Sequence, residues 1–373
     1  MVEGVILASI RFLFVLFFFS LKLSLFGDYY ALDPYSPKYL WMDEQIEREF
    51  APFRDGITNE MLAETERLCP LYHRYKIKNS EIFGPEGAVK QMLNRLVLLY
   101  LVPDVEFLYL QSDGIIKVEE DWPVQLADKN FHPEVFPGPV FTSTKDKRCD
   151  RAILFLEWNL YLKGAHASNW PILFKEILSL SEQTSWEKKT SKLFWRGYPM
   201  GFQHDYSHNW KNTPRGKACY LSHLYPDLIN AGFNVTDHTF IVNAQQIENI
   251  NIYKPWVDQP DVMKYKYQLS IDGHTCSYPG LQWKLLSKCT VFLQETEDVM
   301  WFYSQIHPWV HYIPVKKDLS DLKEKVVWAQ LNDRASREIA NNSHEFAKEQ
   351  LHPEAILLYC YKVLCKYASL QRL

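Results

Sequence analysis

Several patterns that would assign this 373-residue chain to a common class of protein are missing from it. No internal repeat or low-complexity tract is visible. No C-x-x-C pair occurs, which argues against a zinc ribbon and against a thioredoxin-like redox motif. A strongly basic charge is also absent. The net charge is −4 and the pI about 6.3, which argues against nucleic acid as the main partner, because phosphate binding needs a basic surface.

The composition is that of a globular protein, with 47% hydrophobic and 23% charged residues. The length is sufficient for two domains of ordinary size. Aromatic residues make up 15% of the chain. This excess fits either a large mixed core or exposed platforms on which sugar rings stack. The seven cysteines are an odd number, so at least one thiol is unpaired within the chain. If the chain is secreted, one or two disulfides can form among the others.

Residues 1–27 form a strongly apolar segment. Its uninterrupted run, 12–21, has about the length of a signal-peptide core. If Arg11 and Lys22 snorkel, roughly 22 residues are available to cross a bilayer. We favour a membrane anchor or an uncleaved signal over a cleaved signal or a buried helix, and therefore a membrane-associated or secretory location. The last residues form no endoplasmic-reticulum retrieval signal.

Predicted strands alternate with predicted helices in both halves of the chain, which indicates an α/β fold of two Rossmann-like domains facing a central cleft. The second half begins near residue 186, where a basic turn precedes a short strand. Residues 28–60 are expected to be an irregular lead-in. The predicted strands are 105–110, 139–145, 193–196 and 264–272, and the main predicted helices are 88–101, 170–180, 215–231, 280–287, 333–351 and 353–370.

Asp113 lies three residues past the predicted strand 105–110, in the phrase PDVEFLYLQSDG. A carboxylate there projects into the crevice above the carboxyl edge of a sheet. It can remove the proton of a hydroxyl that attacks another group. The alternative is an ordinary Asp-Gly turn after a strand.

Two further stretches carry groups that suit a diphosphate. In FWRGYPMG, Arg196 precedes Gly197, so its guanidinium can point into the cleft, although a surface ion pair is the alternative. The turn 274–280 opens a helix whose first amides suit a phosphate. Lys284 either contacts that phosphate or is solvated, and His274 either contacts the ligand or caps the turn.

The segment 264–315 resembles one family closely, glycosyltransferase family 90, which includes protein O-glucosyltransferases and lipopolysaccharide-modifying enzymes. The resemblance rests on a KYKY strand at 264–267, an Asp-Gly turn at 272–273, a Ser-aromatic pair at 277–278 and the closing motif PWVHYIPVK at 308–316. It extends over about 90–352.

The resemblance implies a GT-B-type fold. Its expected parts are residues 1–27 as the hydrophobic segment, 28–185 as an acceptor-binding domain, 186–352 as a nucleotide-sugar-binding domain and 353–373 as a C-terminal helix. It also implies an inverting transfer of glucose or xylose from a UDP-sugar to a hydroxyl of a glycan, lipopolysaccharide or protein serine. A catalytically silent glycan-binding relative of the same fold is the alternative.

Carried over to this chain, the family's motifs make Asp113 the catalytic base. Where many members have an arginine after the aromatic of the donor loop, this chain has Pro279-Gly280, and a second basic residue after Arg196 is also missing. The expected donor-binding residues are Arg196, Gly197, Asp272, Gly273, His274, Thr275, Cys276, Ser277, Tyr278, Gly280 and Lys284, and the expected acceptor-binding residues are Ser143, Trp158 and Trp170.

No metal or other cofactor is expected. Metal-dependent glycosyltransferases of the single-sheet type usually hold their ion with a D-x-D triplet, and this chain contains none. His204 and His208 have the spacing of a zinc pair but lack the Glu of H-E-x-x-H. The cysteine pattern departs from that of the animal O-glucosyltransferases, which weakly favours a glycan or lipopolysaccharide acceptor.

Overall fold

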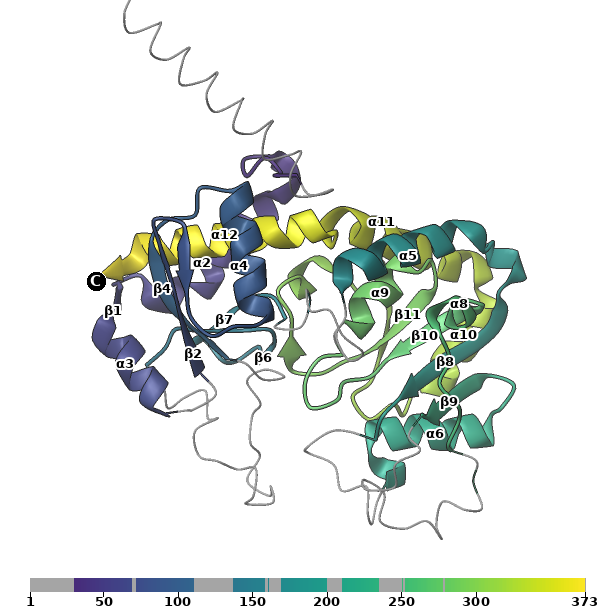
Figure 1. The fold of residues 1–373 in the computed structure, drawn as a ribbon. Helices are drawn as coiled ribbons and strands as arrows, with labels where there is room; N and C mark the ends of the chain where they lie inside the picture. The colour runs from purple at the N-terminus through teal and green to yellow at the C-terminus, as the bar shows by residue number, and fades with distance from the viewer. Residues whose placement is uncertain are drawn as a thin grey trace, which may run out of the picture.

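The computed structural model describes residues 30–68, 72–110, 137–157, 160, 169–199, 210–234, 250, 252–277 and 279–372. Asp113, Trp158, Tyr278, the histidine pair at 204 and 208 and the segment 1–27 all lie outside them. The described chain forms two lobes, each built on a five-stranded sheet, and helices run along one side of both (Figure 1). The fold is therefore mixed α/β with parallel strands.

The first sheet has the strand order β3-β2-β4-β5-β7 and is mixed. Strand β2 (Tyr72–Lys78) pairs antiparallel with both β3 (Glu81–Phe83) and β4 (Val105–Leu110). From β4 onward the pairing through β5 (Val140–Thr142) to β7 (Ala152–Leu154) is parallel. The prediction of a buried strand at 105–110 is confirmed. The hairpin of β2 and β3 was not predicted, because its charged, half-exposed residues interrupt the hydrophobic alternation.

The second sheet has the order β13-β11-β10-β8-β9 and is parallel throughout. Figure 1 shows it beside the first, with α6 (Pro214–Leu224) near its β9 edge. Its strands are β8 (Thr190–Gly197), β9 (Ile229–Phe233), β10 (Tyr265–Ser270), β11 (Thr290–Gln294) and β13 (Ile313–Val315).

The predicted helix 215–231 is wrong in its second half. Helix α6 ends at Leu224, and Pro226 soon afterwards cannot supply the backbone N–H that a continuing helix needs. The residues from Ile229 then extend β8 on its outer side. Alternate buried side chains, Ile229, Ala231 and Phe233, face the core under α6, which is the period of a strand.

The lead-in 28–60 is also more regular than predicted. It contains α2 (Leu40–Glu49), whose Met42 and Ile46 are buried in a helix contact with α12 (Pro353–Leu370). Helix α12 has the predicted bounds. It returns to the first lobe, where β14 (Gln371–Arg372) pairs with β1 (Ile57–Thr58). The other long helices are α3 (Asn59–Leu68), α4 (Ala88–Leu99), α5 (Trp170–Gln183), α10 (Leu322–Leu331) and α11 (Asp333–Gln350), and α9 (Gly280–Leu286) is short.

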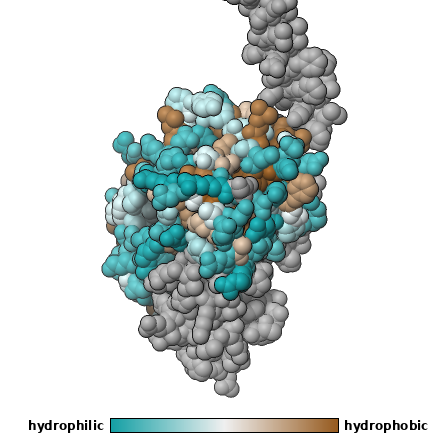
Figure 2. Space-filling model, turned by 90° about the vertical axis from the view of Figure 1, so that its left-hand side faces the viewer, coloured by the Kyte–Doolittle hydropathy of each residue, from teal (hydrophilic) through white to brown (hydrophobic). Residues whose placement is uncertain are grey.

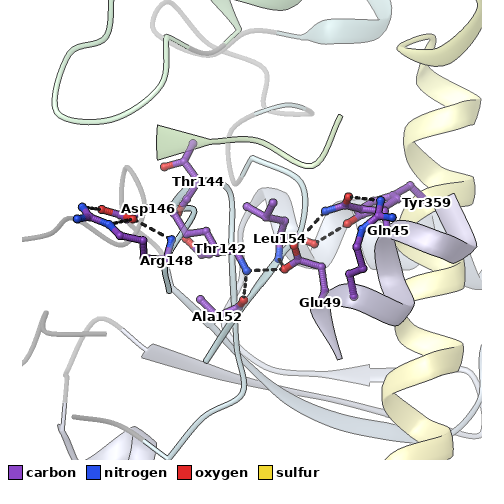
Figure 3. A network of polar contacts seen from close by, with 11 residues as sticks. Gln45, Glu49, Thr142, Thr144, Asp146, Arg148, Ala152, Leu154 and Tyr359 are labelled. Atoms are coloured by element: carbon purple, nitrogen blue, oxygen red, sulfur yellow. Dashed lines mark hydrogen bonds and ion pairs between the residues drawn. The ribbon is translucent and has the colours of Figure 1, made fainter. Parts of the chain in front are cut away.

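A short ribbon connects the two lobes. Strand β6 (Lys145–Asp146) of the first lobe pairs antiparallel with β12 (Asp298–Val299) of the second. A buried network holds β6 in place (Figure 3). Lys145 Nζ lies 2.6 Å from Glu49 Oε2 of α2 and donates to the Ala152 carbonyl oxygen over 2.7 Å. The side chains of Lys145 and Glu49 are both less than a tenth exposed. This buried ion pair attaches the ribbon to α2 of the first lobe.

The hydrophobic core also joins the lobes. One cluster contains the first sheet, α12 and the inner side of α9, while a second lies in the second lobe, under α6, α10 and α11. On the face drawn in Figure 2, hydrophilic side chains prevail and apolar ones gather towards its upper end. No helix in the described ranges is long and apolar enough to cross a membrane. All six described cysteines are free thiols, namely Cys149, Cys219, Cys276, Cys289, Cys360 and Cys365.

Candidate functional site

The loop after β10 is the centre of the candidate site. Asp272 lies in it two residues past Ser270, the carboxyl end of the strand. One carboxylate oxygen, Oδ2, accepts a hydrogen bond from Thr296 Oγ1 over 2.6 Å, and the Asp272 N–H donates to Gln294 Oε1 over 3.1 Å. Gln294 and Thr296 follow from β11, so neighbouring strand ends of the parallel sheet are tied together, where open α/β sheets bind ligands.

Arg215, in the first turn of α6, completes one side of this loop. Thr213 caps the helix by accepting from the Gly216 N–H. From there the Arg215 Nε donates to the Asp272 carbonyl oxygen over 2.9 Å, and Nη1 donates to the Tyr198 carbonyl oxygen over 2.8 Å. A Cβ on Gly273 would lie 2.8 Å from Arg215 Nη2. Gly273 therefore permits the close approach of the guanidinium.

Arg215 was not predicted from the sequence as a site residue. Its motif is a Thr-Pro-Arg helix start, and many helix starts carry an arginine without any ligand. Only the strand order brings α6 next to the end of β10. The sequence did contain one hint. No second basic residue closely follows Arg196, so a diphosphate site would need another cation from elsewhere in the chain.

Lys284 lies on the opposite side of the loop, one turn into α9. Its side chain is buried, with 8% of the residue exposed, so the solvated alternative does not hold. A Cβ on Gly280 would lie 2.6 Å from Ser277 Oγ and 3.5 Å from Lys284 Nζ. The Ser277 hydroxyl and the Lys284 ammonium therefore converge over Gly280.

The charges of the site shift its pKa values. Burial raises the pKa of Asp272 to about 6, although the hydrogen bond from Thr296 and the positive charge of Arg215 oppose the rise. Burial, and repulsion by Arg215, lower the pKa of Lys284 to about 7, while Asp272 opposes that change. A second carboxyl, Asp298, lies near enough to interact with Asp272, and burial together with repulsion by Asp272 raises the pKa of Asp298 to about 7. Arg215 and Lys284 are the cations of this neighbourhood, and such groups suit an anionic ligand.

The remaining residues of the predicted loop divide into two kinds. Thr275 and Cys276 are buried, with 2% and 4% exposed, and the Thr275 carbonyl oxygen accepts from the Gly273 N–H over 2.9 Å. Both residues thus help to shape the loop, and their predicted contact with the donor stays a prediction. His274 is partly exposed within the turn.

Arg196 does not join this cluster through any hydrogen bond between described residues. Its Nη1 donates to the Asn230 carbonyl oxygen over 2.9 Å, and its Nε donates to the Pro255 carbonyl oxygen over 3.3 Å. Its guanidinium lies 4.5 Å from the centre of the Phe194 ring. The predicted orientation into the site is thus corrected, because Arg196 is bound to β9 and to the segment that follows it. Gly197 next to it accommodates the Trp195 ring, which a Cβ would approach to 2.6 Å.

Two of the predicted acceptor residues, Ser143 and Trp170, lie in the described part of the chain. Trp170 is fully buried, and its indole Nε1 donates to the Leu351 carbonyl oxygen over 2.7 Å. Its predicted contact with an acceptor is corrected to a packing role. Ser143 follows β5 and is 1% exposed. Glu157, which was not predicted from the sequence as a site residue, follows β7 at the same edge and is 3% exposed, and burial raises the pKa of its carboxyl to about 8.

No group of three or more His, Cys, Asp or Glu side chains within the described part of the chain could hold a metal ion. The described geometry places Arg215, Ser277 and Lys284 around one loop in the second lobe. In the first lobe it places two polar side chains, Ser143 and Glu157, beyond the ends of the parallel strands β5 and β7.

Known proteins resemble this chain over most of its length. Human protein O-glucosyltransferase 3 is 28% identical over 344 residues, which cover 88% of this chain but only 62% of that protein. Rat protein O-glucosyltransferase 1 is 29% identical over 349 residues, which cover 87% and 79%. Among solved structures, HepE of Anabaena in complex with UDP-glucose aligns with a TM-score of 0.40 and 12% identity over 70% of this chain and 71% of that one. The model of glycosyl transferase family 90 matches residues 36–373, and the protein therefore belongs to that family.

Proposed function

We propose that this protein is an inverting, metal-independent glycosyltransferase of the GT-B type that transfers glucose or xylose from a UDP-sugar to a hydroxyl. The observation that carries the proposal is the convergence of Arg215, Lys284 and Ser277 on the loop at the carboxyl end of β10. In this proposal residues 186–352 bind the nucleotide-sugar, residues 28–185 bind the acceptor, and the C-terminal helix (353–373) joins the two.

The reaction is a single displacement at the anomeric carbon of the sugar. Asp113 takes the proton of the acceptor hydroxyl as the new bond from oxygen to carbon forms. The bond from that carbon to the diphosphate oxygen breaks at the same time, and negative charge grows on the leaving UDP. Arg215 and Lys284 stabilise this charge by hydrogen bonds and by their proximity, which is the work that a divalent ion performs in metal-dependent enzymes.

The acceptor is a hydroxyl of a protein serine, a glycan or a lipopolysaccharide. The relatives named above are protein O-glucosyltransferases, which supports a protein acceptor. The cysteine pattern, which departs from that of the animal O-glucosyltransferases, supports a glycan or lipopolysaccharide acceptor instead.

Release of UDP from UDP-glucose tests the proposal, measured for the wild type and for Asp113→Asn with candidate acceptors present. We expect Asp113→Asn to lower kcat at least about 100-fold while the affinity for UDP stays within about threefold. Asp150→Asn, at an exposed carboxylate, is the matched control and keeps full activity. Equal turnover of both variants contradicts the role of Asp113. Tight binding of sugar without any turnover in the wild type supports the silent glycan-binding relative instead.

We also propose that residues 1–27 attach the protein to a membrane or direct it into the secretory pathway. The support is the apolar character of this segment, which leads into the described chain at its first residues. Alkaline carbonate extraction of membranes from cells that express the full chain tests attachment. Retention of the protein in the membrane pellet is the expected result, and its complete release contradicts an anchor.

A further inference from the structure

We propose that Ser143 and Glu157 together bind an uncharged hydroxyl of the acceptor, next to the hydroxyl that reacts. This inference rests on the proposed function, since it names a recognition site for the second substrate. It concerns two side chains of the first lobe, both outside the Asp272 loop of the second lobe.

The two side chains leave the first sheet at the same edge. Thr142 of β5 pairs with Leu154 of β7, and the Phe155 N–H donates to the Thr142 carbonyl oxygen over 2.7 Å, which extends the parallel ladder by one residue. Ser143 directly follows β5, and Glu157 is three residues past β7, so both lie beyond the carboxyl ends of adjacent strands. Open α/β sheets bind their ligands at that edge.

Both side chains are sequestered and incompletely paired. Ser143 is 1% and Glu157 is 3% exposed. Within the described chain, the Ser143 hydroxyl oxygen and the Glu157 Oε2 have no hydrogen-bond partner. Buried polar atoms in folded proteins are paired as a rule, and an exception needs a reason. The Ser143 hydroxyl and the Glu157 carboxyl lie beyond the ends of adjacent strands, at an edge where such sheets bind ligands. A single bound hydroxyl that pairs with both would explain why neither has a partner.

The groups around Glu157 are already engaged elsewhere. Tyr109 of β4 donates its hydroxyl to the Leu156 carbonyl oxygen over 2.9 Å, and Cys360 of α12 forms a hydrogen bond with the Leu156 backbone. Thr142 donates its hydroxyl to the Thr144 carbonyl oxygen over 2.8 Å. The titratable groups that face this position from β4 and α12 are therefore a phenol and a thiol, both uncharged at neutral pH, since burial raises the pKa of each.

The apolar surroundings of Glu157 favour an uncharged hydroxyl over a charged ligand group. Burial without a compensating cation raises the pKa of Glu157 to about 8, so the carboxyl is protonated at neutral pH. A protonated carboxyl donates one hydrogen bond and accepts another, as Ser143 does. A sugar or serine hydroxyl has the same double capacity. A phosphate or carboxylate on the acceptor would instead meet an acid that repels it as soon as it ionises.

The experiment measures binding of one defined probe, methyl β-D-glucopyranoside, to the full chain in the presence of UDP. Ser143→Ala and Glu157→Leu should weaken probe binding at least about tenfold, whereas Glu157→Gln, which keeps a donor and an acceptor in the same shape, should stay within about threefold. UDP affinity, measured alone, should not change in any of the three variants. Thermal unfolding identifies a variant that fails to fold. In that case the test is the pH dependence of probe binding, compared between the wild type and Glu157→Gln.

A second readout separates recognition from packing. Affinity of the wild type for the probe should fall when the pH rises above about 8, where Glu157 ionises, and Glu157→Gln should remove this fall. Failure of the proposed function shows itself as no UDP release by the wild type with any acceptor, whatever the probe does. Absence of probe binding to the wild type, or equal binding by the wild type and Glu157→Leu, overturns the inference.

Discussion

The Nε of Arg215 donates to the carbonyl oxygen of Asp272 over 2.9 Å, although the two residues are 57 positions apart in the chain. The bond fixes the first turn of α6 against the loop that ends β10. The guanidinium is thereby held against the backbone of the loop, and its positive charge acts on the Asp272 carboxylate. The Asp272 and Tyr198 carbonyl oxygens hold it in one orientation.

Replacing this cation should weaken donor binding. We expect Arg215→Ala to reduce the affinity for UDP about 10- to 100-fold, since a hydrogen bond to a charged group contributes about 1.5–3 kcal/mol. Isothermal titration with UDP measures the change. Arg337→Ala, which removes an exposed ion pair with Glu187, is the control and should leave the affinity as it is. An Arg215→Ala variant with wild-type affinity would assign the guanidinium a structural role only.

Donor binding should depend on pH through Lys284. Because the pKa of Lys284 is lowered to about 7, a rise in pH above that value removes its charge from the free protein. Bound diphosphate favours the ammonium form, so affinity should fall by up to about tenfold per pH unit above about pH 7. Asp272 has its pKa near 6, so its ionisation is largely complete in this range.

Titrations with UDP between about pH 7 and pH 9 test this dependence. Lys284→Met should bind more weakly at neutral pH and should show no further fall through that range. Lys264→Met, at an exposed lysine paired with Asp261, should follow the wild type. A wild-type affinity that is flat in pH would contradict the placement of Lys284 at the diphosphate.

Glu157 should make the folded state less stable as the pH rises. Its pKa is raised from an ordinary 4.5 to about 8 in the folded protein, so between these values the folded state holds one proton more than the unfolded chain. The free energy of unfolding should therefore decrease by about 1.4 kcal/mol per pH unit over this window and level off above it. Urea unfolding of the wild type at several pH values measures the slope. Glu157→Gln should reduce the slope by that amount, whereas Glu47→Gln, at an exposed carboxylate, should not.

The buried pair that holds the connecting ribbon should be important for stability. Lys145→Ala leaves the Glu49 carboxylate buried without its cation (Figure 3), and we expect a loss of about 3–5 kcal/mol in the free energy of unfolding. Lys147→Ala, two residues further on, removes an exposed pair with Glu297 and should cost less than about 1 kcal/mol. Equal losses in the two variants would show that burial of the pair is energetically unimportant.

The elements that were predicted correctly have local signals. The strand 105–110 is an apolar run that Glu106 alone interrupts, and it follows Pro103-Asp104. The helix 353–370 starts with proline and keeps a helical period to its end. The hairpin of β2 and β3 and the strand β9 lacked such signals. Their residues are held in strands by pairing with β4 and β8, which lie far away in the chain.

For the candidate site, the sequence indicated the Asp272 loop, with Ser277 and Lys284, because a polar turn between a buried strand and a helix is a local pattern. The sequence did not indicate the orientation of Arg196. No residue near it in the chain shows that its guanidinium donates to the Asn230 carbonyl oxygen of β9. Trp170 was equally ambiguous, because an indole can stack on a sugar or fill a core with the same neighbours in sequence.

The order of residues along the chain was enough to determine the family, most of the long helices, several strands, and the loop that closes β10, because neighbouring residues encode hydrophobic period, turns and caps. The partners of Arg196, Arg215 and Glu49, and the burial of Glu157, were decided by the folded arrangement alone. These relationships join segments as far apart as the 96 positions between Glu49 and Lys145, and strand order is set by the packing of the whole core rather than by any one segment.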